Sequence, residues 1–263
     1  MVIWWKNITL KKKYGQNFLS DEKIISNITS LIKPKEDDLI IEIGPGSGAL
    51  TKNLVKYNSN LICYEVDKDL ENVLSKFENE KTKIIFDDFL KRDILSDIKE
   101  IKYNKLFIIG NLPYYITTPI ILSIIESSLN VENMVFMVQK EVADRFSSNP
   151  GSKEYGSISV LLNYYFNIKK LFDVSRTKFY PVPNVDSSVI KFEKKDYLIP
   201  VDFEKFNKLV RDSFQFKRKN IKNNLKGYDL NKIDEVLKKY SFSLSSRAEE
   251  LSMDIFVDIA NNI

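Results

Sequence analysis

Residues 41–51 read IEIGPGSGALT, and this stretch decides the fold class. An apolar run rich in β-branched residues leads into a turn with glycine at positions 44, 46 and 48, and a segment compatible with a helix follows. Glycine lets the backbone bend tightly and approach a ligand, and the start of a helix offers free N–H groups. The stretch therefore predicts a strand, a tight turn and a helix, with a ligand bound at the turn.

Short apolar runs of the same kind recur along the chain, at 61–66, 83–88, 105–111 and 134–139. The stretches between them, such as 48–57 and 68–79, are long enough for helices. This alternation predicts βαβ units that build a parallel sheet. Two later runs, at 161–174 and 187–193, predict an antiparallel hairpin that brings the mostly parallel sheet to seven strands.

After about residue 196 the pattern changes to helical spacing. Four apolar residues between Phe203 and Phe214 lie on one face, which predicts an amphipathic helix. We therefore expect an α/β domain over residues 1–195 and a small all-α domain over residues 196–263.

Composition removes several classes of protein. The chain has 263 residues, of which 43% are apolar, and its net charge of +4 is only mildly basic. It has no histidine and one cysteine, Cys63, so the usual zinc sites and the Ser-His-Asp and Cys-His nucleophiles cannot be assembled. No run approaches the ~18 apolar residues of a membrane span, and MVIWW is too short for a signal sequence. We expect a cytoplasmic protein without a metal or a membrane partner.

Carboxylates accompany the glycine turn. Glu65 ends the second apolar run, where a carboxylate can accept both hydroxyls of a ribose. The glycines run G-x-G-x-G instead of G-x-G-x-x-G, and Glu42 places inside the strand an acid that would repel a pyrophosphate. The turn at Gly44 and Gly46 therefore predicts S-adenosylmethionine, which carries ammonium and sulfonium groups, in place of NAD. Asp88, which ends the third run, is placed to accept a hydrogen bond from the adenine amine of that cofactor.

The fourth apolar run ends in GNLPYY, residues 110–115. Asn111 follows the strand at the sheet edge where ligands bind in open α/β folds, and Pro113 restricts the backbone after it. The amide oxygen of Asn111 and a backbone carbonyl, from Leu112 or Pro113, can accept hydrogen bonds from an adenine amine while Tyr114 stacks on its ring. Two fixed acceptors draw that nitrogen towards tetrahedral geometry and stabilise the positive charge that develops as it attacks a methyl group. No side-chain base is required.

An adenine within RNA or DNA must first leave its stack, which costs a few kcal/mol. A second ring opposite Tyr114 would offset this cost, because stacking contributes roughly 1–3 kcal/mol per base. Phe179, in KFYPVPNVDSS, is the predicted second ring, with Tyr180 as the alternative.

Seven motifs, in order and spacing, resemble the KsgA (RsmA) family of small-subunit ribosomal RNA adenine dimethyltransferases. They are KKKYGQNFL, IEIGPGSGALT, YEVDKDL, GNLPYYITTPI, FYPVPNVDSSV, FKRKNIKNNL and RAEELS. The likeness runs from Lys11 to about Ile259. It implies a Rossmann-like methyltransferase fold and the transfer of four methyl groups from S-adenosylmethionine to two adjacent adenines near the 3′ end of small-subunit rRNA. The substrate would be a pre-30S particle in ribosome biogenesis. We expect a monomer.

The resemblance also assigns residues. Asn17 and Leu19 would contact the cofactor together with Gly44, Glu65, Asp88 and Asn111. Asn111, Leu112, Pro113 and Tyr114 would hold the target base, with Phe179 stacking from the other side. The run FKRKN departs from the expected pair of adjacent arginines, since Lys217 and Arg218 stand there.

Two groups of cations are candidate RNA contacts: Lys11, Lys12 and Lys13 before the cofactor segment, and Lys217, Arg218, Lys219 and Lys222 in the helical domain. Solvated surface charge is the alternative for both. Beside an adenine site, however, contact with RNA phosphates is favoured, and recognition of a folded particle by shape is expected.

Three other functions remain open. The first is a large-subunit rRNA adenine methyltransferase of the antibiotic-resistance type, which shares the catalytic domain; the TTP after NLPYY and the run KRKNIKNNLKGYDL favour the small-subunit group. The second is an assembly or transcription factor that has lost catalysis, against which the joint presence of Glu65, Asn111 and Tyr114 speaks. The third is a DNA adenine methyltransferase, for which no sequence-reading domain is evident.

Overall fold

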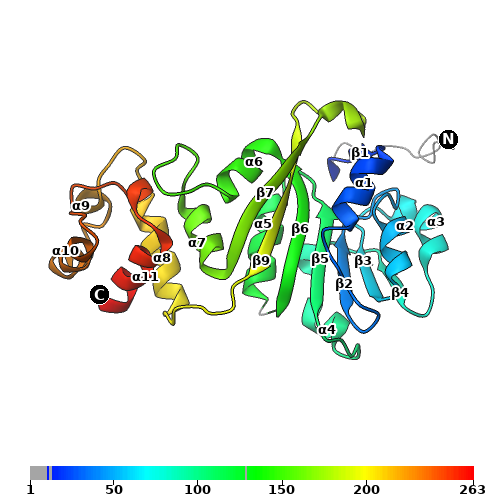
Figure 1. The fold of residues 1–263 in the computed structure, drawn as a ribbon, viewed down its shortest axis with the longest axis horizontal. Coiled ribbons are helices and arrows are strands. Elements are labelled where there is room, and N and C mark those ends of the chain that lie inside the picture. Colours follow the sequence, from blue (N-terminus) through cyan, green and yellow to red (C-terminus); the bar gives the residue numbers. More distant parts are fainter. Residues whose placement is uncertain (1–10, 12–13, 128) are drawn as a thin grey trace. The chain divides into compact units, whose positions relative to one another are not determined.

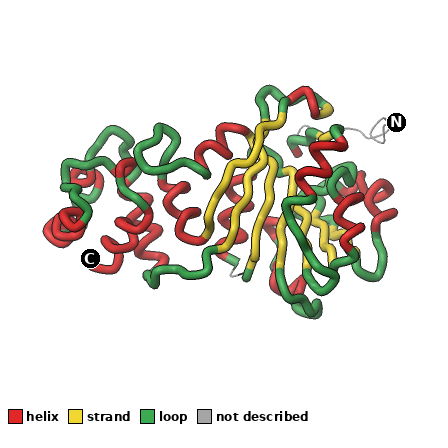
Figure 2. Tube along the Cα trace, viewed as in Figure 1, coloured by secondary structure: helices red, strands yellow, loops and turns green. Residues whose placement is uncertain are grey.

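The structure is a computed structural model that describes residue 11, residues 14–127 and residues 129–263. The chain divides into two compact units (Figures 1 and 2). Unit 1 comprises residues 1–140 and 170–193, and unit 2 comprises residues 141–169 and 194–263.

Unit 1 contains the strands and the helices between them, except that the first four residues of β7 and the last residue of β9 belong to unit 2. The strands are β1 (Phe18–Leu19), β2 (Leu39–Ile43), β3 (Asn60–Tyr64), β4 (Thr82–Ile85), β5 (Leu106–Asn111), β6 (Val131–Gln139), β7 (Phe166–Val174), β8 (Phe179–Tyr180) and β9 (Ser187–Lys194). The α-helices are α1 (Glu22–Thr29), α2 (Thr51–Leu54), α3 (Glu71–Leu74), α4 (Ile94–Ile98) and α5 (Thr117–Glu126). Short 3-10 helices are η3 (Val55–Tyr57), η4 (Lys68–Leu70), η5 (Ser75–Phe77), η6 (Phe89–Lys91) and η7 (Arg176–Lys178).

The main sheet has seven strands in the order β4-β3-β2-β5-β6-β9-β7. β2 pairs in parallel with both β3 and β5, β5 pairs in parallel with β6, and β9 runs antiparallel to β6. The predicted α/β fold with a mostly parallel seven-stranded sheet is therefore confirmed. The chain builds outward from β2 to β4, then returns to place β5 on the other side of β2. This reversal creates a crevice beyond the carboxyl ends of β2 and β5, where ligands bind in such sheets.

One face of the sheet is covered by a core that α1, α2 and α3 help to form. Ile25 and Ile28 of α1 pack with Leu54 of α2 and Leu74 of α3 against strand residues such as Ile40. Burying such side chains contributes about 1.5–3 kcal/mol each. Cys63 is fully buried in the same cluster, as the apolar run around it indicates.

Unit 2 is a separate helical core. Its α-helices are α6 (Lys140–Phe146, whose first residue belongs to unit 1), α7 (Ser157–Tyr165), α8 (Phe203–Ser213), α9 (Ile221–Asn224), α10 (Leu230–Lys239) and α11 (Met253–Asn262), with the 3-10 helix η8 (Ala248–Glu250). The stripe predicted after residue 196 lies on α8 and the residue after it, where Phe206 and Val210 are fully buried and Phe203 and Phe214 pack against the cluster.

The run at 161–174 differs from the expected strand. Its first five residues complete α7, and the strand β7 begins only at Phe166. Val160, Leu161 and Tyr164 of α7 pack with residues of α8 such as Phe206, so a helix is what buries their apolar side chains. Tertiary packing has here overridden the strand preference of a run rich in aromatic residues. The segment 141–169 accordingly belongs to unit 2, whereas the expected domain of residues 1–195 included it.

No helix in the part of the chain that the structure describes is long and apolar enough to cross a membrane.

Candidate active site

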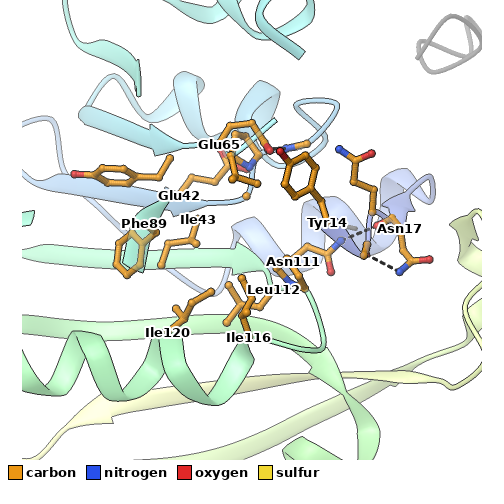
Figure 3. A pocket seen from close by; sticks show the side chains of 18 of the residues that line it. Tyr14, Asn17, Glu42, Ile43, Glu65, Phe89, Asn111, Leu112, Ile116 and Ile120 are labelled. Atoms are coloured by element: carbon orange, nitrogen blue, oxygen red, sulfur yellow. Dashed lines mark hydrogen bonds between the residues drawn. The ribbon is translucent and has the colours of Figure 1, made fainter. Parts of the chain in front are cut away.

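A cavity of about 260 Å³ lies at the carboxyl ends of the central strands of unit 1 (Figure 3). Five segments line it: residues 14–19, residues 42–50, the end of β3, residues 87–90 and residues 111–120. Every residue predicted to bind the cofactor lines this cavity, namely Asn17, Leu19, Gly44, Gly46, Glu65, Asp88 and Asn111. The reversal of strand order therefore brings together residues that are nearly a hundred positions apart.

The glycine turn is held in place by Glu65. One carboxylate oxygen accepts the N–H of Gly46 at 2.9 Å and the other accepts the N–H of Asp67 at 2.9 Å. Gly46 has a φ of +57°, and a Cβ there would lie 3.0 Å from the ring of Phe18, so both backbone conformation and space favour glycine. Each carboxylate oxygen keeps further lone pairs with which it can accept a ribose hydroxyl.

Glu42 lies beneath the turn and is 1% exposed. Its carboxylate accepts hydrogen bonds from Thr51 Oγ1 at 2.7 Å and from Cys63 Sγ at 3.5 Å. Burial raises the pKa of Glu42 to about 7, and the hydrogen bond from Thr51 opposes that rise. Burial likewise raises the pKa of Glu65. The sequence identified the acid inside the strand but not this raised pKa, which depends on packing.

Among the described residues, the charged side chains of the cavity lining are all acidic: Glu42, Glu65, Asp87 and Asp88. Asp88 caps η6, where its side chain accepts the N–H of Leu90 at 3.1 Å. A cavity whose described lining residues include acidic groups and no lysine or arginine fits a cationic ligand and would repel a pyrophosphate. S-adenosylmethionine fits this set of donors and acceptors.

Asn111 ends β5, and its side-chain nitrogen donates to the backbone oxygen of Asn17 at 3.0 Å (Figure 3). This bond commits the amide nitrogen and leaves Oδ1 as the acceptor, since no described residue donates to it. Pro113 O already accepts from Ile116 N at 3.2 Å and Thr117 Oγ1 at 3.1 Å. Of the two backbone carbonyls that the sequence left open, the one without a donor among the described residues is that of Leu112.

Tyr114 is held by a partner that the sequence did not reveal. Its hydroxyl lies 2.9 Å from Oγ of Ser187, a residue of β9 that is fully buried. The bond fixes the far end of the ring, while Pro113 restricts the backbone before it. Ser187 belongs to the quoted motif FYPVPNVDSSV, but nothing in the sequence pairs it with a residue 73 positions earlier.

A family model described as "Ribosomal RNA adenine dimethylase" matches residues 7–263. The chain belongs to this ribosomal RNA adenine dimethylase family. As a member it is a methyltransferase that dimethylates adenine in ribosomal RNA, with S-adenosylmethionine as the methyl donor. The resemblance seen in the seven motifs is thereby confirmed.

The names of individual relatives agree with the family assignment of this dimethylase. A "Ribosomal RNA small subunit methyltransferase A" of Mycoplasma mobile is 42% identical over 248 residues, which is 94% of this chain and 95% of the relative. The protein of the same name from Ligilactobacillus salivarius is 40% identical over 97% of this chain and 90% of its own length.

Two solved structures share the fold of this dimethylase. A dimethyladenosine transferase from Plasmodium falciparum has a TM-score of 0.79 and 23% identity over 92% of this chain and 95% of that chain. The 23S rRNA methyltransferase ErmE has a TM-score of 0.73 and 22% identity over 94% of this chain and 99% of that chain. At these identities the likeness establishes the fold.

Phe179 is the predicted base-binding residue of this dimethylase that lies outside the cavity lining. It is 3% exposed, because the short sheet that β8 forms with β1 pairs it with Leu19 and places its ring in the core cluster. Phe179 is therefore not among the residues that line the cavity in this structure. A stacking role for Phe179 stays a prediction. Tyr180, the alternative, is 51% exposed.

The N-terminal segment forms a wall of the cavity, and we call residue 11 and residues 14–19 the N-terminal clasp. Lys11 Nζ lies 2.5 Å from Oδ1 of Asp67 and 2.6 Å from Oδ2 of Asp69. Gln16 Nε2 donates to the other oxygen of Asp67 at 2.7 Å, and Gln16 Oε1 accepts Lys11 N at 2.9 Å. Burial alone would raise the pKa of Asp67, but the hydrogen bonds from Lys11 and Gln16 lower it.

The clasp includes one of the predicted RNA-binding cations. Lys11 forms ion pairs with Asp67 and Asp69 of the same chain. Its contact with RNA stays a prediction. Lys12 and Lys13 lie outside the described residues. Lys217, Arg218, Lys219 and Lys222 are exposed on unit 2, and the structure assigns them no ion pair among the described residues. They stay predicted RNA contacts.

Proposed function

We propose that this dimethylase methylates the exocyclic amines of two adjacent adenines near the 3′ end of 16S-type small-subunit rRNA, on a pre-30S particle during ribosome biogenesis. The names of relatives that are about 40% identical over most of the chain support the small subunit as substrate. We further propose that the protein acts as a monomer in the cytoplasm. Residues 194–263 and the segment 141–169 would form the RNA-binding part.

The observation that carries the proposed mechanism is the anchoring of Asn111. Because its nitrogen is bound to Asn17 O, its oxygen is set in advance to accept one N–H of the target amine. The carbonyl of Leu112 accepts the second, since that of Pro113 is engaged. Both oxygens are fixed before the reaction, so the developing positive charge on the nitrogen meets dipoles that need no reorganisation. The surplus proton then leaves to water.

Other residues hold the two reactants. Tyr114 stacks on the target ring and is kept in position by Ser187. Glu65 binds the ribose of S-adenosylmethionine, Asp88 its adenine amine, and the turn at Gly44 and Gly46 approaches its remaining part. When bound, the cofactor supplies the electrophilic methyl group.

The test supplies labelled S-adenosylmethionine together with small subunits that lack this modification or with large subunits, and then maps the modified bases. We expect label on two adjacent adenines near the 3′ end of the small-subunit RNA. Label confined to large-subunit RNA would instead select the activity named for ErmE. Label in neither, with cofactor bound, would overturn the proposed substrate.

A further inference from the structure

An exposed aromatic ring lies in the most basic part of unit 2. Phe216 belongs to the segment 214–220 that links α8 to α9, which we call the basic loop. Its side chain is 55% exposed, and it is the one phenylalanine among the described residues that is exposed rather than buried or half-buried. Every other described phenylalanine is buried or packs against apolar side chains. The exposed ring of Phe216 is therefore a candidate contact for a binding partner.

The exposure does not come from a loosely held backbone. Asn224 of α9 brackets the loop: its Nδ2 donates to Ser213 O at 2.7 Å, and its Oδ1 accepts Phe216 N at 3.3 Å. Lys219 N also donates to Phe216 O at 2.9 Å, which closes a turn around the residue. The backbone that carries the ring is therefore set before any partner binds.

The surroundings of the ring are strongly cationic. Lys217, Arg218, Lys219, Lys222 and Lys226 are all exposed, and residues 213–228 contain no aspartate or glutamate. No ion pair is formed by any of the five among the described residues. By contrast, Lys208 on the neighbouring helix pairs with Asp212 at 2.6 Å. Uncompensated cations in this density favour a polyanion and disfavour a basic protein.

We propose that Phe216 stacks on an unpaired base of the bound ribosomal RNA while Lys217, Arg218 and Lys219 contact the flanking phosphates. An aromatic ring among cations is the arrangement that binds single-stranded nucleic acid, because every base offers a π-face and its neighbours offer charge. The contact is additional to the target adenine, whose binding residues belong to unit 1. The inference rests on the proposed small-subunit substrate and deepens it.

The experiment measures binding of the full-length chain to small subunits that lack the modification. Phe216→Ala and Phe216→Leu are expected to weaken binding by about 5- to 150-fold, which corresponds to the loss of one stacked base at 1–3 kcal/mol. Phe216→Trp is expected to keep binding within about threefold of the unsubstituted chain, because it retains a stacking surface. Tyr197→Ala is the matched control, since Tyr197 is also exposed on unit 2 but lies outside the basic loop.

The salt dependence of RNA binding distinguishes the contribution of the Phe216 ring from that of the cations. In Phe216→Ala the slope of log K against log salt should match that of the unsubstituted chain, whereas Lys217→Ala should reduce it by about one. Binding of Phe216→Ala within about twofold of normal overturns the proposal. Normal binding by Phe216→Leu combined with weak binding by Phe216→Ala also overturns it, in favour of an apolar protein partner. Base mapping with the unsubstituted chain tests the proposed small-subunit substrate separately. A failure of that proposal can therefore be distinguished from a failure of the proposed Phe216 contact.

Discussion

At the scale of single residues, one hydrogen bond of Asn111 fixes the orientation of its side-chain amide. The side-chain nitrogen donates to Asn17 O, so the same bond that holds the N-terminal clasp also orients the amide and its oxygen. The sequence predicted the residue and its role as an acceptor. It left the choice between two backbone carbonyls open, and the two hydrogen bonds that Pro113 O accepts support the proposal of Leu112 as the second acceptor.

Asn111→Ala should lower kcat for methyl transfer by about 10²–10³, the usual cost of losing one preorganised partner of developing charge. Cofactor affinity should fall only modestly, because Glu65 and Asp88 remain. Single-turnover rates and cofactor binding by calorimetry measure the two effects separately. Glu65→Ala is the reciprocal control and should weaken cofactor binding first. Near-normal turnover in Asn111→Ala would show that the acceptor pair is not the source of catalysis.

Glu42 makes a second prediction at this scale, concerning pH. Its pKa is raised from 4.5 to about 7 in the folded state, so between these values the folded chain holds a proton that the unfolded chain has lost. Stability therefore falls as pH rises through this window, by up to about 1.4 kcal/mol per pH unit for this group. Glu42→Gln should remove that slope while the amide oxygen still accepts from Thr51. Urea unfolding from pH 5 to 8 measures it, and parallel curves for the two chains would contradict the assignment.

At the scale of elements, the N-terminal clasp couples two segments that the sequence places far apart. Gln16 and Asp67 both lie in motifs that resemble the family, yet they are 51 residues apart and no pattern pairs them. Lys11, a predicted RNA contact, forms ion pairs with two carboxylates of the same chain, which the sequence did not indicate. The element that results is one wall of the cofactor cavity.

Lys11→Ala should raise the KM for S-adenosylmethionine several-fold while kcat at saturating cofactor stays near normal, because the clasp positions a wall and takes no part in the reaction. Lys11→Arg should restore most of the affinity. Lys52→Ala, which removes the exposed ion pair with Glu22 away from the cavity, is the control and should change neither constant. If Lys11→Ala weakened binding of the small subunit and left this KM unchanged, the original assignment to RNA would be the better one.

At the scale of the whole molecule, the division into two units determines which fragments of the chain keep their core packing. Unit 2, the helical unit, includes α7, which lies in the middle of the sequence. Tyr155, Val160 and Leu161 pack in its core with residues of α8 and α11. A fragment ending at residue 195 should therefore unfold at a lower temperature than the full chain and bind more of a hydrophobic dye, since these side chains lose their partners. Thermal unfolding with dye binding measures this, and a fragment with an unchanged midpoint and no added dye binding would contradict it.

The sequence by itself determined the sheet, the glycine turn, the acids around it and the NLPY motif, because each depends on the local order of residue types and on strand periodicity. Only the tertiary structure decided that the carbonyl of Leu112 has no donor among the described residues, that burial raises the pKa of Glu42, that Lys11 is paired, that Phe179 lies in the core and that α7 belongs to the helical unit. Each of these depends on neighbours distant in the chain, since burial and pairing are set by packing. The local pattern of residue types does not predict which groups distant in the chain will be in contact.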